Sequence, residues 1–304
     1  MKKIRLVFPY PESPFSHVAL RAGIEVVRPS PLPVAHYPSP KLSGLSRAIF
    51  DVNKFLTGSP CLLPPAYDEE VMVKAVGLLE AGETCVLTDV APLFSRPRLL
   101  VKVLVNARKN LPPDVKVLVP CVPHTFLPLM AYLEFELIDV SYAFLKAGEG
   151  VYLTPHGEHP VKEVGEFPCH CEACLKGDPK SSVRDLALHN LNTFKKVGVE
   201  VNNAVENGFL RELLEGFASF SAGLMAALRV LDREFWELLD LITPVTSKRG
   251  PVCICDEAFW RPEFVRWFVR LKERYVPPKR QVMLLLPCSA KKPYSRSKTH
   301  IAIR

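Results

Sequence analysis

The first half of the chain alternates between helical and strand-like spacing of its apolar residues. Helical spacing is expected over 69–81, 99–110 and 126–134, and short buried strands over 85–87, 115–119 and 135–140. This alternation favours an α/β fold with a parallel sheet. Before it, residues 1–65 mix short apolar stretches with prolines, which predicts strand-like pieces and loops.

Helical spacing dominates the middle of the chain. Amphipathic helices are expected over 185–204, 208–218 and 221–241. Thr243-Pro244 and Gly250-Pro251 then mark a boundary near residue 245. Beyond that boundary, a strand-like stretch at 252–256, a helix at 261–274 and a strand at 281–286 together predict a βαβ-like unit.

Size and charge add an expectation about partners. A length of 304 residues is enough for two domains, or for one large α/β domain with an appendage. Lys and Arg exceed Asp and Glu by 39 − 32 = 7, and residues 272–304 hold nine Lys and Arg against one acid, Glu273. Such a stretch would attract a phosphate backbone, although a solvated basic surface without a partner has the same pattern.

The N-terminus carries no pattern of a secretory signal, because Pro9 and Pro11 interrupt a short apolar run. No apolar run approaches membrane-spanning length. The chain has nine cysteines, an odd number, which together with the missing signal fits a reducing compartment. We therefore expect a cytoplasmic protein without membrane contact.

One short segment combines the residue types of a metal site. Cys169, Cys171 and Cys174 are followed after fifteen residues by His189, which supplies three thiolates and one imidazole. Zn²⁺ favours sulfur and nitrogen donors, and a structural site is closed by four protein ligands. A disulfide or three unrelated thiols are the alternatives, but neighbours this close cannot easily bridge each other. The spacing predicts a structural zinc site.

Four stretches in order resemble the C-terminal part of the tRNA-guanine transglycosylase catalytic domain. They are residues 137–144, residues 152–157, Phe167-Pro168 with the cysteine cluster, and residues 188–191. The resemblance implies a TIM barrel with a zinc subdomain of this ligand set. A complete barrel uses roughly 250 residues, yet 168 residues precede Cys169. The expected fold is therefore α/β, with an incomplete transglycosylase-like barrel.

A second resemblance lies near the end of the chain. Residues 287–300 are similar to the Pro-Cys-x3-Lys-Pro-Tyr-x2-Ser-x2-His signature of archaeosine synthase, a transglycosylase relative. The resemblance implies action on tRNA that carries 7-cyano-7-deazaguanine in the D-loop. It also implies lysine as the amine added across the nitrile, and a radical enzyme that later releases the product base. The family has further domains beyond this signature, so a partner polypeptide that supplies them is expected, unless the chain is a fragment or a minimal form.

The two resemblances divide the chain into three expected parts. These are a barrel-like region over 1–160, a zinc-binding helical subdomain over 161–245, and the start of a C-terminal archaeosine-synthase-like α/β unit over 246–304.

The C-terminal signature contains the expected catalytic groups. A thiolate attacks a nitrile readily, so Cys288 is the candidate nucleophile, with Lys291 and Lys292 favouring its ionised form. His300 is a candidate proton donor or acceptor at the nitrile nitrogen. The alternative is that Cys288 is a small buried residue at a strand end and that the lysines bind phosphate only.

Asp139 follows an apolar strand, where the transglycosylases keep the carboxylate that attacks the ribose. Under a transglycosylase reaction it would be the nucleophile. Under the synthase reaction the glycosidic bond stays intact, so Asp139 would be a relic, a capping group or a contact to the base.

Two other functions compete with the synthase reaction. They are base exchange in tRNA, and the role of a non-catalytic zinc-containing tRNA-binding subunit.

Overall fold

The structure is a computed structural model that describes residues 2–8, 16–26, 61–63, 70, 73, 84–87, 90–112, 114–246, 249–282, 284–286 and 288–303. The chain divides into two compact units, Met1–Arg266 and Trp267–Arg304, which are described separately. Most of the helix predicted over 69–81, and most of the first 65 residues, lie outside the described residues. None of the described helices is both long and apolar enough to cross a bilayer.

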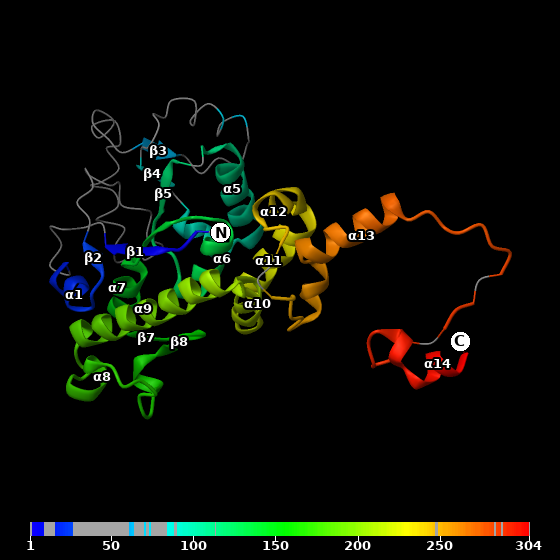
Figure 1. Cartoon of the computed structure of the whole chain (residues 1–304). Helices are drawn as coiled ribbons and strands as arrows, with labels where there is room; N and C mark the ends of the chain where they lie inside the picture. The colour runs from blue at the N-terminus through cyan, green and yellow to red at the C-terminus, as the bar shows by residue number, and fades with distance from the viewer. Residues whose placement is uncertain are drawn as a thin grey trace. The chain divides into compact units, whose positions relative to one another are not determined.

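Six parallel strands form the main sheet of the first unit (Figure 1). They are β1 (Arg5–Phe8), β2 (Glu25–Val26), β3 (Cys61–Leu63), β4 (Thr84–Leu87), β5 (Lys116–Val119) and β6 (Leu137–Asp139). Their order is β2-β1-β6-β5-β4-β3, so β1 pairs with β6, the last strand of this sheet along the chain. Within this sheet, strands β3 to β6 follow each other in the chain and the first strand lies beside the sixth, which is compatible with a partial barrel. The predicted parallel α/β class is confirmed.

The strands are short runs of apolar residues because both faces of the sheet are covered. In β4 and β5 only the first residue is exposed, and the three that follow are buried. Helices α5 (Pro97–Asn110) and α6 (Leu127–Tyr132) alternate with these strands, as the periodicity predicts, and α7 (Ser141–Gly148), which was not predicted, follows β6. The 3₁₀ helices η1 (Ala91–Ser95) and η2 (His124–Phe126) precede α5 and α6.

The long helix α9 (Val183–Asn207) connects the sheet with the rest of the first unit. It packs against α7, α1 (Ser16–Arg21) and β7 (Val151–Thr154), which pairs in antiparallel fashion with β8 (Gly157–Pro160). The side chain of Ser182 caps its first turn by accepting a hydrogen bond from the amide of Asp185 at 3.2 Å. Gly208 ends the helix with φ +74°, which favours glycine.

Three shorter helices follow: α10 (Leu210–Phe220), α11 (Ala222–Glu234) and α12 (Trp236–Ile242). The prediction of one helix over 221–241 is wrong, because Phe235 leaves helical geometry with φ −131° and ψ 30°. The break turns Leu238 and Leu239 into the core. Apolar spacing continues through this point, so periodicity alone does not reveal the break.

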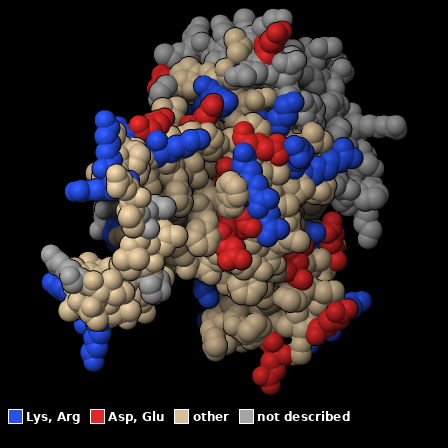
Figure 2. Space-filling model, turned by 90° about the vertical axis from the view of Figure 1, so that its right-hand side faces the viewer, with Lys and Arg blue, Asp and Glu red and all other residues tan. Residues whose placement is uncertain are grey.

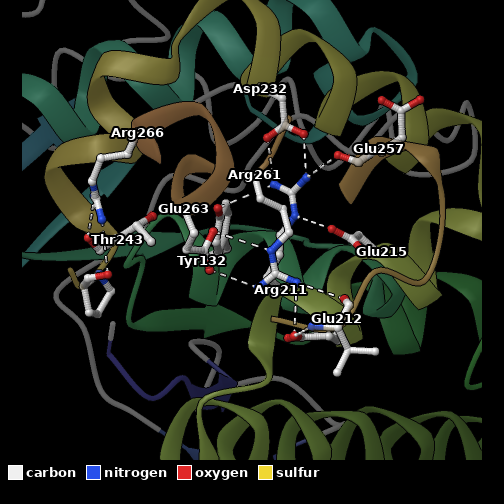
Figure 3. Close-up of polar contacts among 12 residues, drawn as sticks. Tyr132, Arg211, Glu212, Glu215, Asp232, Thr243, Glu257, Arg261, Glu263 and Arg266 are labelled. Atoms are coloured by element: carbon white, nitrogen blue, oxygen red, sulfur yellow. Dashed lines mark hydrogen bonds and ion pairs between the residues drawn. The ribbon is translucent and has the colours of Figure 1, made fainter. Parts of the chain in front are cut away.

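A buried network of charged residues holds these helices together (Figure 3). The guanidinium of Arg211 on α10 donates two hydrogen bonds to Asp232 on α11, at 2.7 and 2.6 Å, and one to Glu215 at 2.8 Å. Arg261 donates to Glu212 at 3.0 Å and to the carbonyl of Val252 at 3.1 Å. The network therefore attaches the segment after residue 250 to α10, and it includes η4 (Asp256–Trp260) through Glu257.

The division between the units falls within α13 (Pro262–Arg274), and the second unit also contains η5 (Tyr294–Arg296) and α14 (Lys298–Ile303). The helix predicted over 261–274 is confirmed. The strands predicted over 252–256 and 281–286 are not observed in the described residues of those stretches. A strand needs a neighbour that pairs its amides and carbonyls, and Val282, Leu284 and Leu285 stand 70 to 83% exposed instead.

Candidate functional site

The four residues of the predicted metal site come together in the first unit. One donor atom from each of Cys169, Cys171, Cys174 and His189 lies within 4.8 Å of every other. Cys169 and Cys171 lie in the loop before α8 (Glu172–Lys176), Cys174 lies on α8, and His189 lies on α9. The Nδ1 atom of His189 is 3.3 Å from the sulfur of Cys174 and 3.6 Å from that of Cys171. This cluster could hold a metal ion.

The imidazole of His189 is oriented by contacts on its other side. Its Nε2 lies 2.8 Å from the carbonyl oxygen of Leu153, to which it donates. That bond leaves the lone pair on Nδ1, the nitrogen that faces the sulfur atoms. Tyr152 stacks on the ring, and its hydroxyl lies 3.6 Å from the sulfur of Cys174. Orientation by a backbone carbonyl is what metal-ligating histidines usually show.

The protonation of the cluster agrees with a cation site. Burial lowers the pKa of His189 to about 4, which keeps the imidazole neutral and able to coordinate. Burial also raises the pKa of the Cys174 thiol to about 12 and raises that of Cys171. Three thiolates this close together would repel one another unless a cation balanced their charge. The donor set of three sulfur atoms and one nitrogen therefore fits Zn²⁺.

Asn190 fixes the position of His189 relative to β7. Its side-chain oxygen accepts a hydrogen bond from the amide of Leu153 at 3.0 Å, and its nitrogen donates to the carbonyls of Val151 and Ala143. A cavity of about 550 Å³ opens beside the cluster and is lined by Cys169, Cys171 and His189 among others. The site is buried on the α9 side, where His189 and Asn190 lie, and half-buried on the cysteine side.

Asp139 is completely buried at the carboxyl end of β6. Its Oδ1 accepts hydrogen bonds from the amide, at 2.8 Å, and the hydroxyl of Ser141, and its Oδ2 accepts one from the amide of Cys121 at 3.1 Å. Burial raises the pKa of Asp139 to about 6. Both oxygens are thus engaged with the start of α7 and with Cys121, whose φ is +51°.

The second unit brings together three residues of the C-terminal signature. Cys288 is exposed, and its sulfur lies 3.3 Å from the hydroxyl of Tyr294 and 3.9 Å from Nζ of Lys292. Hydrogen bonding from Tyr294 and the charge of Lys292 lower the pKa of the Cys288 thiol. Lower pKa and exposure are the features of a reactive cysteine.

His300 and two serines complete this arrangement. The ring of His300 stacks on that of Tyr294, with 4.8 Å between centroids and 2° between planes. The hydroxyl of Ser289 donates to that of Ser297 at 2.9 Å, which closes the loop between Cys288 and α14. Lys291 makes its contact through the backbone, donating its amide to Ser289. Lys292, and not Lys291, is the lysine next to the sulfur.

Two aromatic residues at these sites were missed by sequence reasoning. Tyr152 stacks on His189 from a strand 37 residues earlier in the chain, so no local spacing reveals it. Tyr294 is part of the C-terminal signature, so the motif could have drawn attention to it. Its role could not be inferred from the motif, because that role depends on which side chains contact it.

Comparison with known proteins finds similarity to proteins named as archaeosine synthases and tRNA-guanine transglycosylases. A family model described as a domain of unknown function (DUF5591) matches residues 264–304. The archaeosine synthase subunit alpha of Methanosarcina acetivorans is 30% identical over 239 residues, covering 75% of this chain and 38% of that protein. The archaeosine synthase of Haloferax volcanii is 32% identical over 221 residues, covering 72% of this chain and 37% of that protein.

Transglycosylases are related as well. The tRNA-guanine(15) transglycosylase of Korarchaeum cryptofilum is 35% identical over 158 residues, which is 49% of this chain and 27% of that enzyme. The chain spans less than two fifths of the length of each of these three relatives. Both resemblances inferred from the motifs are confirmed.

Proposed function

We propose that this chain, a relative of the archaeosine synthases, takes part in converting 7-cyano-7-deazaguanine in the D-loop of tRNA toward archaeosine. The reaction is the addition of an amine, lysine, to the nitrile carbon. The observation that carries the proposal is the exposed sulfur of Cys288 next to Lys292 and Tyr294, with His300 stacked on the ring of Tyr294.

In the first step the thiolate of Cys288 attacks the nitrile carbon. A carbon–sulfur bond forms, the triple bond becomes a double bond, and the nitrogen takes up a proton, which His300 can supply. In the second step the lysine amine adds to the same carbon and loses a proton. The carbon–sulfur bond breaks, the thiolate leaves, and an amidine remains on the base. No oxidant or reductant is needed.

The positive residues of the second unit have a supporting role. Lys292 stabilises the thiolate, and Lys291, which donates its amide to Ser289, would offer its ammonium to a phosphate. On the face drawn in Figure 2, Lys and Arg lie interspersed with Asp and Glu. The stretch 272–304, with its single acid, is therefore the more suitable contact for the tRNA backbone.

Zn²⁺ is proposed as the ion of the cysteine cluster, with a structural role. Cys169, Cys171, Cys174 and His189 would hold it, and bound zinc would supply a tetrahedral crosslink between α8 and α9. In this interpretation residues 1–160 form an incomplete transglycosylase-like barrel, residues 161–245 its zinc subdomain, and residues 246–304 the start of the synthase unit. Asp139 is a capping group, since its oxygens bind Ser141 and Cys121.

The chain is proposed to work with partners in the cytoplasm. These would be a partner polypeptide and a radical enzyme that releases the product base. The word "subunit" in the name of the Methanosarcina relative supports a partner for that protein.

Two labelled reactions test this function. Incubation with tRNA that carries the cyano base and labelled lysine should label the tRNA. Incubation with unmodified tRNA and labelled deazaguanine should not. Incorporation in the second reaction alone would identify a transglycosylase instead. A non-catalytic tRNA-binding subunit would leave conversion by its partner unchanged in the Cys288→Ala variant.

A further inference from the structure

The tyrosine of the C-terminal signature touches all of the reactive groups in that unit. Its hydroxyl lies 3.3 Å from the sulfur of Cys288. The ammonium of Lys292 sits 3.6 Å from the centroid of its ring, which is cation–π geometry. The His300 imidazole lies parallel to the same ring. Among the described residues, no other side chain of this unit contacts all three.

We infer that Tyr294 is a positioning residue that favours the thiolate of Cys288, keeps Lys292 beside the sulfur and holds His300 against its own ring. When the thiol of Cys288 ionises, its sulfur can only accept, so the hydroxyl of Tyr294 donates the hydrogen bond. A hydrogen bond to a charged acceptor is stronger than one to a neutral acceptor, so this contact favours the ionised form. The inference rests on the proposed function, because Tyr294 matters for catalysis only if Cys288 is the nucleophile. The ionisation of Cys288 can nevertheless be measured without the catalytic reaction.

The other groups around the sulfur are few. Lys292 provides the nearby positive charge, and the backbone amide of Ser289 also favours the thiolate. Tyr294 is the larger influence of the two side chains in lowering the pKa of Cys288. The Nδ1 atom of His300 is buried and finds no hydrogen-bond partner among the described residues. Stacking on the ring of Tyr294 therefore contributes to the position of this imidazole.

Two substitutions separate the hydroxyl from the ring. Tyr294→Phe keeps the ring and removes the donor, whereas Tyr294→Leu removes both. Tyr275→Phe is the matched control, since Tyr275 is an exposed tyrosine of the same unit. The measurement is the rate of alkylation of Cys288 by iodoacetamide across pH 6 to 10 in the full chain, with the modified peptide quantified by mass spectrometry.

In Tyr294→Phe the alkylation profile should shift to higher pH, with a several-fold slower reaction at pH 7, while Tyr275→Phe matches the wild type. Lys292→Gln should shift the profile in the same direction. A Tyr294→Phe profile that superimposes on the wild type would overturn the inference. Because no tRNA is present, a failure here is distinct from a failure of the proposed function, and unchanged circular dichroism would confirm that the variants fold.

Discussion

The imidazole of His189 lies flat against the ring of Tyr152, with 3.7 Å between the ring centroids and 12° between the ring planes. This contact joins β7 to α9 directly behind the cysteine cluster. Together with the bond from Nε2 of His189 to the carbonyl of Leu153, it fixes the imidazole before any ion binds. A ligand that is already oriented loses less conformational freedom on coordination.

The cysteine cluster should bind about one zinc ion per chain, as a closed four-ligand site does. Cys171→Ser should lose the bound zinc and lower the melting temperature, because metal binding and folding are coupled. The measurements are elemental analysis of the purified protein and thermal unfolding. Cys253→Ser is the control, as Cys253 is exposed and outside the cluster. Zinc content equal to wild type in Cys171→Ser would contradict the assigned ligand set.

The buried network of Arg211 should contribute strongly to stability. Arg211→Met leaves Asp232 and Glu215 buried without their partner, which should lower the free energy of unfolding by about 3 to 5 kcal/mol. Arg98→Gln is the control: it breaks the pair between Arg98 and Glu234, in which the side chains are 74 and 38% exposed, and should cost less than about 1 kcal/mol. Denaturant unfolding measures both. Equal losses in the two variants would show that burial of the network is unimportant.

Features of this chain that depend on local spacing could be predicted from the sequence, whereas features that depend on long-range contacts could not. The cysteine spacing identified its four residues because three of them lie within six positions. The strand expected over 281–286 was wrong, since an apolar run favours a strand but pairing with a neighbouring strand decides whether one forms. Phe235 interrupts a helix whose apolar period continues across it. Tertiary neighbours, which no single segment specifies, account for both errors.

His124 should make the stability of the protein depend on pH. It is buried, and Nε2 donates to the carbonyl of Thr154 at 2.7 Å. Burial lowers its pKa from 6.5 to about 4, against the opposing influence of the Thr154 carbonyl and Glu158. The folded state therefore resists protonation while the unfolded chain accepts it. Stability present above pH 6.5 should be lost as the pH falls toward 4, by about 3 kcal/mol in total.

The comparison that isolates this contribution is with His124→Gln, which keeps a donor for the Thr154 carbonyl and does not titrate. The difference in unfolding free energy between the wild type and this variant should fall between pH 6.5 and pH 4. His159→Gln, at an exposed position, serves as the control. A constant difference over that range would disprove the assignment to His124.

The basic stretch should make tRNA binding sensitive to salt. Lys279 and Arg280 are exposed neighbours in the second unit. Each phosphate contact contributes roughly 0.7 to 0.9 to the slope of log K against log salt concentration. The double variant Lys279→Gln/Arg280→Gln should therefore flatten that slope by roughly 1.5 in titrations at several salt concentrations.

Lys116→Gln is the matched control for this titration, because Lys116 begins β5, at the amino end of the strand, and ligands of α/β folds bind at the carboxyl ends. Its slope should equal that of the wild type. If the double variant and Lys116→Gln give the same slope, the stretch 272–304 does not hold the tRNA backbone.

Mass spectrometry of tRNA nucleosides tests the central claim most directly. The chain, with and without a Cys288→Ala substitution, is incubated with lysine and with tRNA that carries 7-cyano-7-deazaguanine, in the presence of its partner polypeptide. The account predicts that the wild type increases the mass of the modified nucleoside by one lysine, and that the Cys288→Ala chain leaves it unchanged. Equal conversion by both chains would contradict it.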